Sequence, residues 1–211
     1  VRLIAHTQMS KVNIGQRKAH LMEIQINGGD IAAKVDFAKG FLEKEIAINQ
    51  VFQEGEMVDT CSVGKGFGFE GVIHRIGDKR LQKKTHRGRR KVASIGPFEP
   101  RGVSWGVGRA GQRGFHHRTD LNKRIYRLGE ADPTGKGNTG STKYDITQKS
   151  INPMGGFPHY GLVKNQFLIL KGSITGTVKR AITLRKPINQ DHHRIATEEI
   201  GLKWIDTSSK F

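Results

Sequence analysis

A long basic segment in the middle of the chain limits what this sequence can fold into. Between Arg75 and Arg127 it has 16 Lys and Arg residues against three Asp and Glu residues, and it is rich in glycine. No apolar repeat of 2 or of 3.6 residues is sustained along it, so it lacks the patterns of a half-buried strand and of an amphipathic helix. Such a segment cannot bury enough apolar surface to offset its own ordering entropy. We therefore predict an extended arm or a long loop.

The charge of the whole chain indicates a polyanionic partner. There are 36 Lys and Arg residues against 19 Asp and Glu residues, which gives a net charge of +17 on 211 residues. A surface of one sign opposes compaction and attracts phosphate groups. Because most of the excess lies in one continuous segment, the sequence predicts a nucleic-acid-binding protein with a basic arm.

The two flanks of the basic segment have the short alternating apolar runs of half-buried strands. In one of them, Met22, Ile24 and Ile26 fall on the same face, and Asn27-Gly28-Gly29 then breaks the run. We predict a turn over Gly172 to Thr177 that leads from the third of these strands to the fourth. The predicted strands are His20 to Ile26, Met57 to Val63, Phe167 to Lys171 and Lys179 to Arg185.

One amphipathic helix is predicted between the first two strands. Apolar side chains recur at Ile31, Val35, Ala38 and Leu42, after Asp30 as the N-cap. The spacing favours packing of this stripe against the core. Together with the strands, it predicts a mainly β body with one or a few short helices, from which a long basic extension leaves in the middle of the sequence.

The sequence shows no constellation for catalysis or for metal binding. Gly66, Gly68 and Gly71 match a dinucleotide-binding spacing, but the residues that follow lack helical apolar spacing and no acidic residue stands at the ribose-binding distance. The histidine pairs at 116–117 and 192–193 are adjacent, which does not place two imidazoles on one helix face. Cys61 is the only cysteine, and we interpret it as a small buried residue. We expect no enzyme activity and no cofactor.

The basic segment has the side chains that RNA contacts require. An arginine guanidinium grips two phosphate oxygens, a lysine acts as a mobile point charge, and exposed rings stack on unpaired bases. For each ring, packing against its own backbone is the alternative. The candidate RNA-binding residues are Lys83, Lys84, His86, Arg87, Arg89, Arg90, Lys91, Phe98, Arg101, Trp105, Arg109, Arg113, His116, His117, Arg118, Lys123 and Arg124.

Several stretches closely resemble the universal large-subunit ribosomal protein three family in its eukaryotic cytosolic form, in unbroken order along nearly the whole chain. They are KAHLMEIQINGG (18–29), KTHRGRRKV (84–92), RAGQRGFHHRTDLN (109–122), SINPMGGFPHYG (150–161), LKGSITGTVKRAITLR (170–185) and LKWIDTSSKF (202–211). The resemblance implies a structural constituent of the large subunit that binds and organises rRNA. It also implies a central extension that reaches toward the peptidyl transferase centre. A free-standing basic RNA chaperone is the alternative.

The resemblance also implies an architecture and partners. The expected fold is a partly open β-barrel of the translation-protein type, with residues 1–74 and 150–211 as the body, a helix near 31–46, and residues 75–149 as the extension. We expect an internal portion that lacks the family's N-terminal arm and C-terminal tail. The expected partners are large-subunit rRNA and neighbouring large-subunit proteins, with no membrane, no small-molecule substrate and no homo-oligomer. The expected location is the cytoplasmic ribosome after nucleolar assembly, and the only expected ions are structural Mg²⁺ bound by the rRNA.

Two positions in the basic segment are singled out by the resemblance. The family has an Ala-Trp-His-Pro run at the inner tip of the extension, where this chain has Pro97-Phe98-Glu99-Pro100. Phe98 keeps a ring there but has no indole N–H. His86 corresponds to a histidine that is modified in some members of the family, so the resemblance makes it a candidate modification site.

Overall fold

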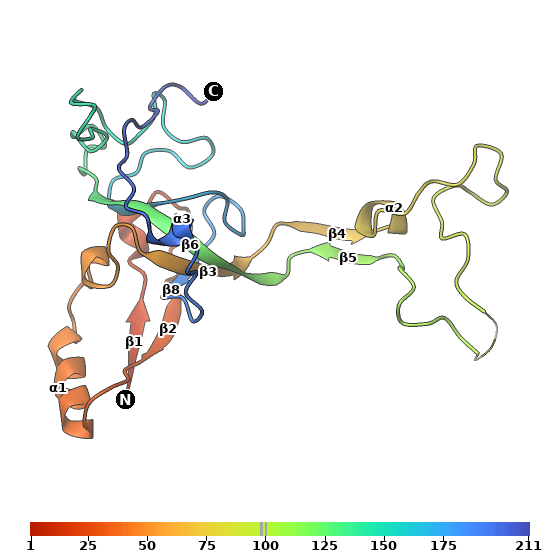
Figure 1. Ribbon diagram of the computed structural model, residues 1–211, viewed down its shortest axis with the longest axis horizontal. Helices are drawn as coiled ribbons and strands as arrows, with labels where there is room; N and C mark the ends of the chain where they lie inside the picture. The colour runs from red at the N-terminus through yellow and green to blue at the C-terminus, as the bar shows by residue number, and fades with distance from the viewer. Residues whose placement is uncertain (98, 100) are drawn as a thin grey trace. The chain divides into compact units, whose positions relative to one another are not determined.

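The computed structural model describes residues 1–97, 99 and 101–211, apart from the side chain of Ile195 (Figure 1). Its strands are β1 (Arg2–His6), β2 (Leu21–Gln25), β3 (Met57–Val63), β4 (Gly66–Glu70), β5 (Gly111–Gly114), β6 (His117–Glu130), β7 (Gln166–Leu170) and β8 (Thr183–Arg185). Its helices are α1 (Ile31–Phe41), α2 (Val72–Arg75) and α3 (Arg194–Thr197), with 3₁₀ turns at Met9–Lys11 and Ile48–Gln50. The prediction of a mainly β chain with few short helices is confirmed.

The strands form three open sheets. A four-stranded sheet has the order β7-β6-β3-β8, and two-stranded sheets pair β1 with β2 and β4 with β5. Within the described residues no sheet closes into a barrel, so the chain shows open sheets where the resemblance implies a partly open barrel. None of the helices in the described part of the chain has the length and apolarity that crossing a bilayer requires.

The core lies in the four-stranded sheet and is small. Phe52, Val58 and Ile125 are buried together, and Leu170 and Leu184 pack against them from the edge strands. Val58 is 0% exposed and Ile125 is 1% exposed, so each contributes about 1.5–3 kcal/mol of hydrophobic stabilisation.

A buried carboxylate joins three strands of this sheet. Asp59 on β3 is 1% exposed. Its Oδ1 accepts a hydrogen bond from the backbone N–H of Asn122 on β6 at 3.0 Å. Its Oδ2 accepts from Nε and Nη2 of Arg185 on β8, at 3.2 and 3.1 Å. Because a buried charge is costly unless it is paired and hydrogen-bonded, this arrangement explains how an aspartate lies at the centre of the sheet.

Several predicted elements are confirmed. Strand β3 has the predicted bounds, β2 falls inside the predicted run from His20, and β7 is shifted by one residue. Helix α1 begins after Asp30 as predicted, although the Asp30 side chain makes no capping hydrogen bond. Strand β8 begins only at Thr183, because the predicted start at Lys179 falls in a turn over residues 178–179.

Other predictions about the flanks are wrong. Every residue of β2 is exposed, so its alternation does not mark a half-buried strand. On α1 only Ala38 is buried, while Ile31 is 77% exposed. Most of the apolar side chains of this stripe on α1 therefore do not pack in the core.

The basic segment contains more regular structure than its sequence predicts. Strand β6 runs for 14 residues from His117, and β5 covers Gly111–Gly114. Between α2 and β5, residues 76–110, no helix or strand occurs in the part that the structure describes. The prediction of an irregular arm therefore applies to 76–110 and is wrong for β6. Polar residues such as Asp120 and Lys123 interrupt the apolar alternation of β6, while pairing with β3 and β7 keeps its backbone extended.

The chain divides into two compact units. The first comprises residues 1–60, 120–174 and 178–211, and the second comprises 61–119 and 175–177. Residues 120–149, which the sequence analysis places in the extension, cluster with the first unit.

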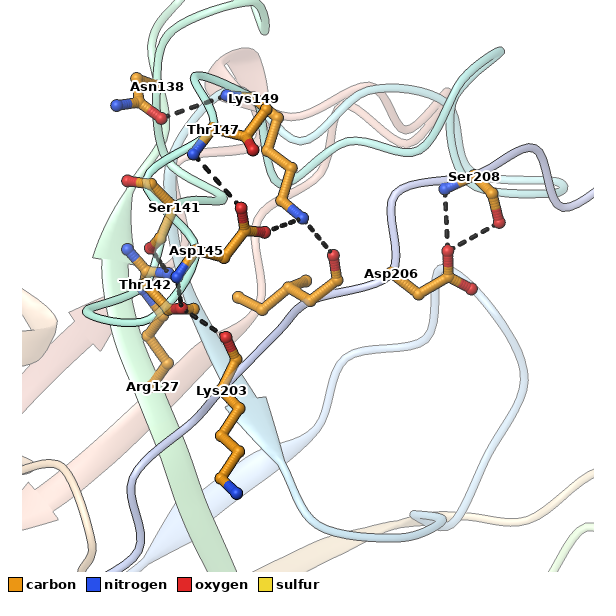
Figure 2. A network of polar contacts seen from close by, with 11 residues as sticks. Arg127, Asn138, Ser141, Thr142, Asp145, Thr147, Lys149, Lys203, Asp206 and Ser208 are labelled. Carbon is orange, nitrogen blue, oxygen red and sulfur yellow. Dashed lines mark hydrogen bonds and ion pairs between the residues drawn. The ribbon is translucent and has the colours of Figure 1, made fainter.

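In the first unit, a polar network holds the segment 203–207 against the loop 138–149 (Figure 2). Lys149 Nζ donates to the main-chain oxygen of Ile205 at 2.7 Å and forms an ion pair with Asp145 Oδ2 at 2.6 Å. Thr142 Oγ1 donates to the oxygen of Lys203 at 2.6 Å. Lys149 Nζ also lies 4.9 Å from the centre of the Trp204 ring. The hydrogen bond from Lys149, followed by those from Thr147, lowers the pKa of Asp145.

Candidate nucleic-acid interface

The second unit contains a closed loop that carries exposed basic side chains. The Leu81 N–H donates to the Arg89 oxygen at 3.0 Å, and Arg89 Nε donates back to the Leu81 oxygen at 3.1 Å. Arg87 and Gly88 have φ of +63° and +104°, which turns the chain back toward its start. The loop therefore has a defined closure, although it has no helix or strand.

Basic groups converge at one side of this loop around a cavity of about 450 Å³. No acidic residue lines it, so the cavity favours an anion. Arg89 lies at the cavity and also closes the loop, so it is partly a structural residue. The lining residues are Arg80, Lys83, Thr85, Gly88, Arg89 and Arg90.

Most of the predicted RNA-binding residues are exposed. Trp105 is 100% exposed, in the irregular part of the unit before β5. Lys83 and Arg90 meet at the cavity, whereas the others are spread along the segment, and no contact of the described residues brings them into one cluster. Phe98 lies outside the described residues. The exposed candidates are Lys83, Lys84, His86, Arg87, Arg90, Lys91, Arg101, Trp105, Arg109, His116, His117 and Arg118.

Two predicted residues on β6, Arg124 and Lys123, are less accessible than the exposed candidates. Arg124 is 4% exposed and donates to the main-chain oxygen of Glu198, so its guanidinium holds the first unit together. Lys123 beside it is half-buried. Because a buried guanidinium cannot reach phosphates without unfolding its surroundings, we leave Arg124 out of the interface.

Arg113 is held by a local network in the second unit. Its Nη1 lies 2.9 Å from Glu70 Oε2, and its guanidinium carbon lies 4.5 Å from the centre of the Phe67 ring. His74 Nδ1 lies 3.2 Å from the same carboxylate oxygen. The hydrogen bond from Arg113 is the main cause that lowers the pKa of Glu70, and His74 adds to it. Glu70 is therefore charged at neutral pH and fixes the position of Arg113.

Several residues besides the predicted candidates also lie at this surface. Arg80 lines the cavity, and its place in the basic run was the available signal. Phe67, Phe69 and Phe115 are 53%, 79% and 62% exposed on and beside the β4–β5 pair. Alternation of rings with glycines in Gly66-Phe67-Gly68-Phe69 could have identified the first two. Nowhere among the described residues do three or more His, Cys, Asp or Glu side chains gather in a way that could hold a metal ion.

Fold and site together define a mainly β, strongly basic protein whose exposed side chains favour anions. Comparison with known sequences then gives the family. The family model described as ribosomal protein L3 matches residues 1–211, and the chain belongs to this family.

Curated relatives agree with this family. The chain is 56% identical over 211 residues to the large ribosomal subunit protein uL3 of Debaryomyces hansenii, with 100% of this chain and 54% of the relative covered. It is 54% identical to the protein of the same name from Saccharomyces cerevisiae, with the same coverage. It is 55% identical over 212 residues to that of Toxocara canis, of which it covers 53%. The chain thus spans about half the length of these relatives.

Proposed function

We propose that this chain is part of a structural constituent of the large ribosomal subunit, and that it binds rRNA through the second unit. Membership of the ribosomal protein L3 family is the observation that carries the proposal. The relatives that span it are named as large-subunit proteins. Its partners would be large-subunit rRNA and neighbouring ribosomal proteins, and its location the cytosolic ribosome.

The charge and geometry of the second unit support rRNA as the direct partner. The cavity at the loop 81–89 is lined by four basic side chains and no acidic one. Phosphate contacts from Lys and Arg position a protein on a nucleic acid without reading its sequence. We assign this positioning role to Lys83, Arg87 and Arg90, with Arg80 at the cavity wall.

A finer proposal concerns the irregular segment 76–110. It is long, strongly basic and without helix or strand where the structure describes it, which suits a segment that takes its order from folded RNA. In agreement with the resemblance, we propose that this segment extends toward the peptidyl transferase centre.

Sedimentation tests the proposal against a free-standing RNA chaperone. Tagged protein should remain with large subunits after a high-salt wash and should have no free pool. A triple variant in which Glu replaces Lys83, Arg87 and Arg90 should be incorporated less into subunits. The matched control changes Lys18, Lys39 and Lys44 to Glu, which alters the net charge equally at exposed positions of the first unit. A soluble free pool for the wild type, or equal incorporation of both triple variants, would contradict the proposal.

A further inference from the structure

We propose that the β4–β5 pair is a stacking site for unpaired RNA bases, formed by the rings of Phe69 and Phe115 and by the guanidinium of Arg113. The proposal rests on the proposed function, because it assumes that the second unit binds RNA. It goes beyond that function by assigning a type of contact and a class of ligand to residues outside the basic loop.

Glycines hold two of the rings of this pair in place. Gly66 on β4 pairs with Gly114 on β5. A Cβ at Gly66 would lie 3.3 Å from the Cβ of Phe115, and a Cβ at Gly114 would lie 2.9 Å from the ring of Phe67. Each ring thus packs over the glycine of the opposite strand. A side chain at Gly66 would force the Phe115 side chain to shift slightly. One at Gly114 would clash first with the main-chain oxygen of Lys65 and then with the Phe67 ring, so this glycine also allows the two strands to approach closely.

Phe115 has a backbone conformation that points to a function. Its φ is +56°, in the left-handed region that bulky residues rarely adopt. Its N–H donates to the Lys65 oxygen at 2.9 Å, which holds the strained turn. Strain of this kind persists at sites where it positions a side chain. Here it positions a ring that remains 62% exposed.

Glu70 and Phe67 fix the direction of Arg113. The carboxylate holds the guanidinium at 2.9 Å and the ring of Phe67 lies 4.5 Å from it. Bases stack on guanidinium planes as well as on aromatic rings, and a guanidinium fixed in advance loses less entropy on binding. Glu70 is therefore a positioning residue that acts through Arg113.

The second unit cannot bury these rings by itself. Among its described residues only Ser62 and Val72 are buried. Exposed rings that gather on one element mark an interaction surface. The segment that carries these rings is strongly basic: residues 61–119 contain 14 Lys and Arg against three Asp and Glu. This charge favours an RNA ligand over an apolar protein surface, and rings beside cations are the usual means of binding unpaired bases.

Binding of two RNA probes to the full 211-residue chain tests the site. One probe is a short oligouridylate that carries a single 2-aminopurine, and the other is a blunt RNA duplex of equal length. Phe69→Leu and Phe115→Leu should each raise the Kd for the single strand about fivefold or more, the lower end of the loss of one base stack. They should reduce 2-aminopurine quenching and leave duplex binding unchanged. Phe37→Leu is the matched control, because Phe37 is 57% exposed on α1 in the first unit.

The Glu70→Gln variant distinguishes the positioning of Arg113 from the effect of net charge on RNA binding. Removal of a negative charge alone would strengthen binding to both probes. Loss of Arg113 positioning predicts tighter or equal duplex binding together with weaker quenching of the single-stranded probe. Circular dichroism spectra that match the wild type confirm that each variant is folded.

The outcomes distinguish failure of this inference from failure of the proposed function. If the wild-type chain binds neither probe, the RNA-binding function itself is wrong. If it binds both, and the two Phe variants keep wild-type affinity and quenching for the single strand, the stacking site is wrong. Wild-type RNA binding of these variants together with their loss from ribosomal subunits would identify the rings as a protein contact and also overturn the stacking site.

Discussion

Asp59 should be the most sensitive polar position in the first unit. Asp59→Ala removes two hydrogen bonds to a guanidinium and leaves the backbone N–H of Asn122 without its acceptor. A hydrogen bond to a charged group contributes about 1.5–3 kcal/mol, and a buried donor without a partner costs about 1–3 kcal/mol. Arg185 is 42% exposed at its side chain and regains water, which offsets part of the loss. We expect a loss of about 3 kcal/mol in the free energy of unfolding.

Urea unfolding of the wild type and variants measures this loss. Arg185→Ala should destabilise by a similar amount, because it leaves a carboxylate that is 1% exposed without its cation. The double variant should cost clearly less than the sum of the two, since either change removes the same interaction. Lys186→Ala is the control. Its ion pair with Glu56 at 3.1 Å involves a Lys side chain that is 63% exposed, so the change should cost under about 1 kcal/mol.

A loss below about 1 kcal/mol for Asp59→Ala, equal to that of the control, would refute this reasoning. If the loss in the double variant equalled the sum of the two single losses, this would also contradict it, because Asp59 and Arg185 would then not act as a pair.

Three further predictions concern charge and order. If the basic arm neutralises about 6 to 10 phosphates, its affinity for isolated RNA should fall about 10³- to 10⁵-fold between about 50 and 200 mM salt, and a flat salt titration would exclude the electrostatic role. Limited proteolysis of the RNA-free chain should first cut between residues 76 and 110, and mass spectrometry should find β6 intact in the early fragments. The pKa of Asp145 is lowered by folding, so its contribution to stability is present above the ordinary value of 3.8 and is lost as the pH falls through the lowered value. Trp204 fluorescence should report this loss at acidic pH, and Asp145→Asn should reduce the pH dependence.

The spacing of apolar residues over short stretches predicted the elements whose formation depends on that spacing. The heptad-like spacing after Asp30 identified α1, and alternation identified β3, whose Val58 lies in the core. In β6 the signal was hidden, because Arg124 is buried by a bond to a residue 74 positions away and Asp120 lies half-buried in the same strand. Such pairing depends on tertiary contacts that no window of the sequence contains.

The sequence could not predict which residues of the candidate site are exposed. Composition pointed to basic residues of the loop 81–89, which the structure leaves exposed or places around one cavity. It could not separate Arg90, at that cavity, from Arg124, inside the first unit. It also overlooked Phe67, because the position of this ring depends on a cross-strand pair of glycines far apart in sequence.

The network around Lys149 has a consequence for synthesis of the chain on a ribosome. Thr142 and Lys149 donate to oxygens that lie 61 and 56 residues later in the sequence. At about 5–20 residues per second, translation reaches those acceptors about 3 to 12 seconds after the loop itself. During that interval the ammonium of Lys149 has neither the Ile205 oxygen nor the Trp204 ring beside it. The loop 138–149 is therefore completed late, and nascent chains that stop before residue 203 should expose it to proteases or to chaperones.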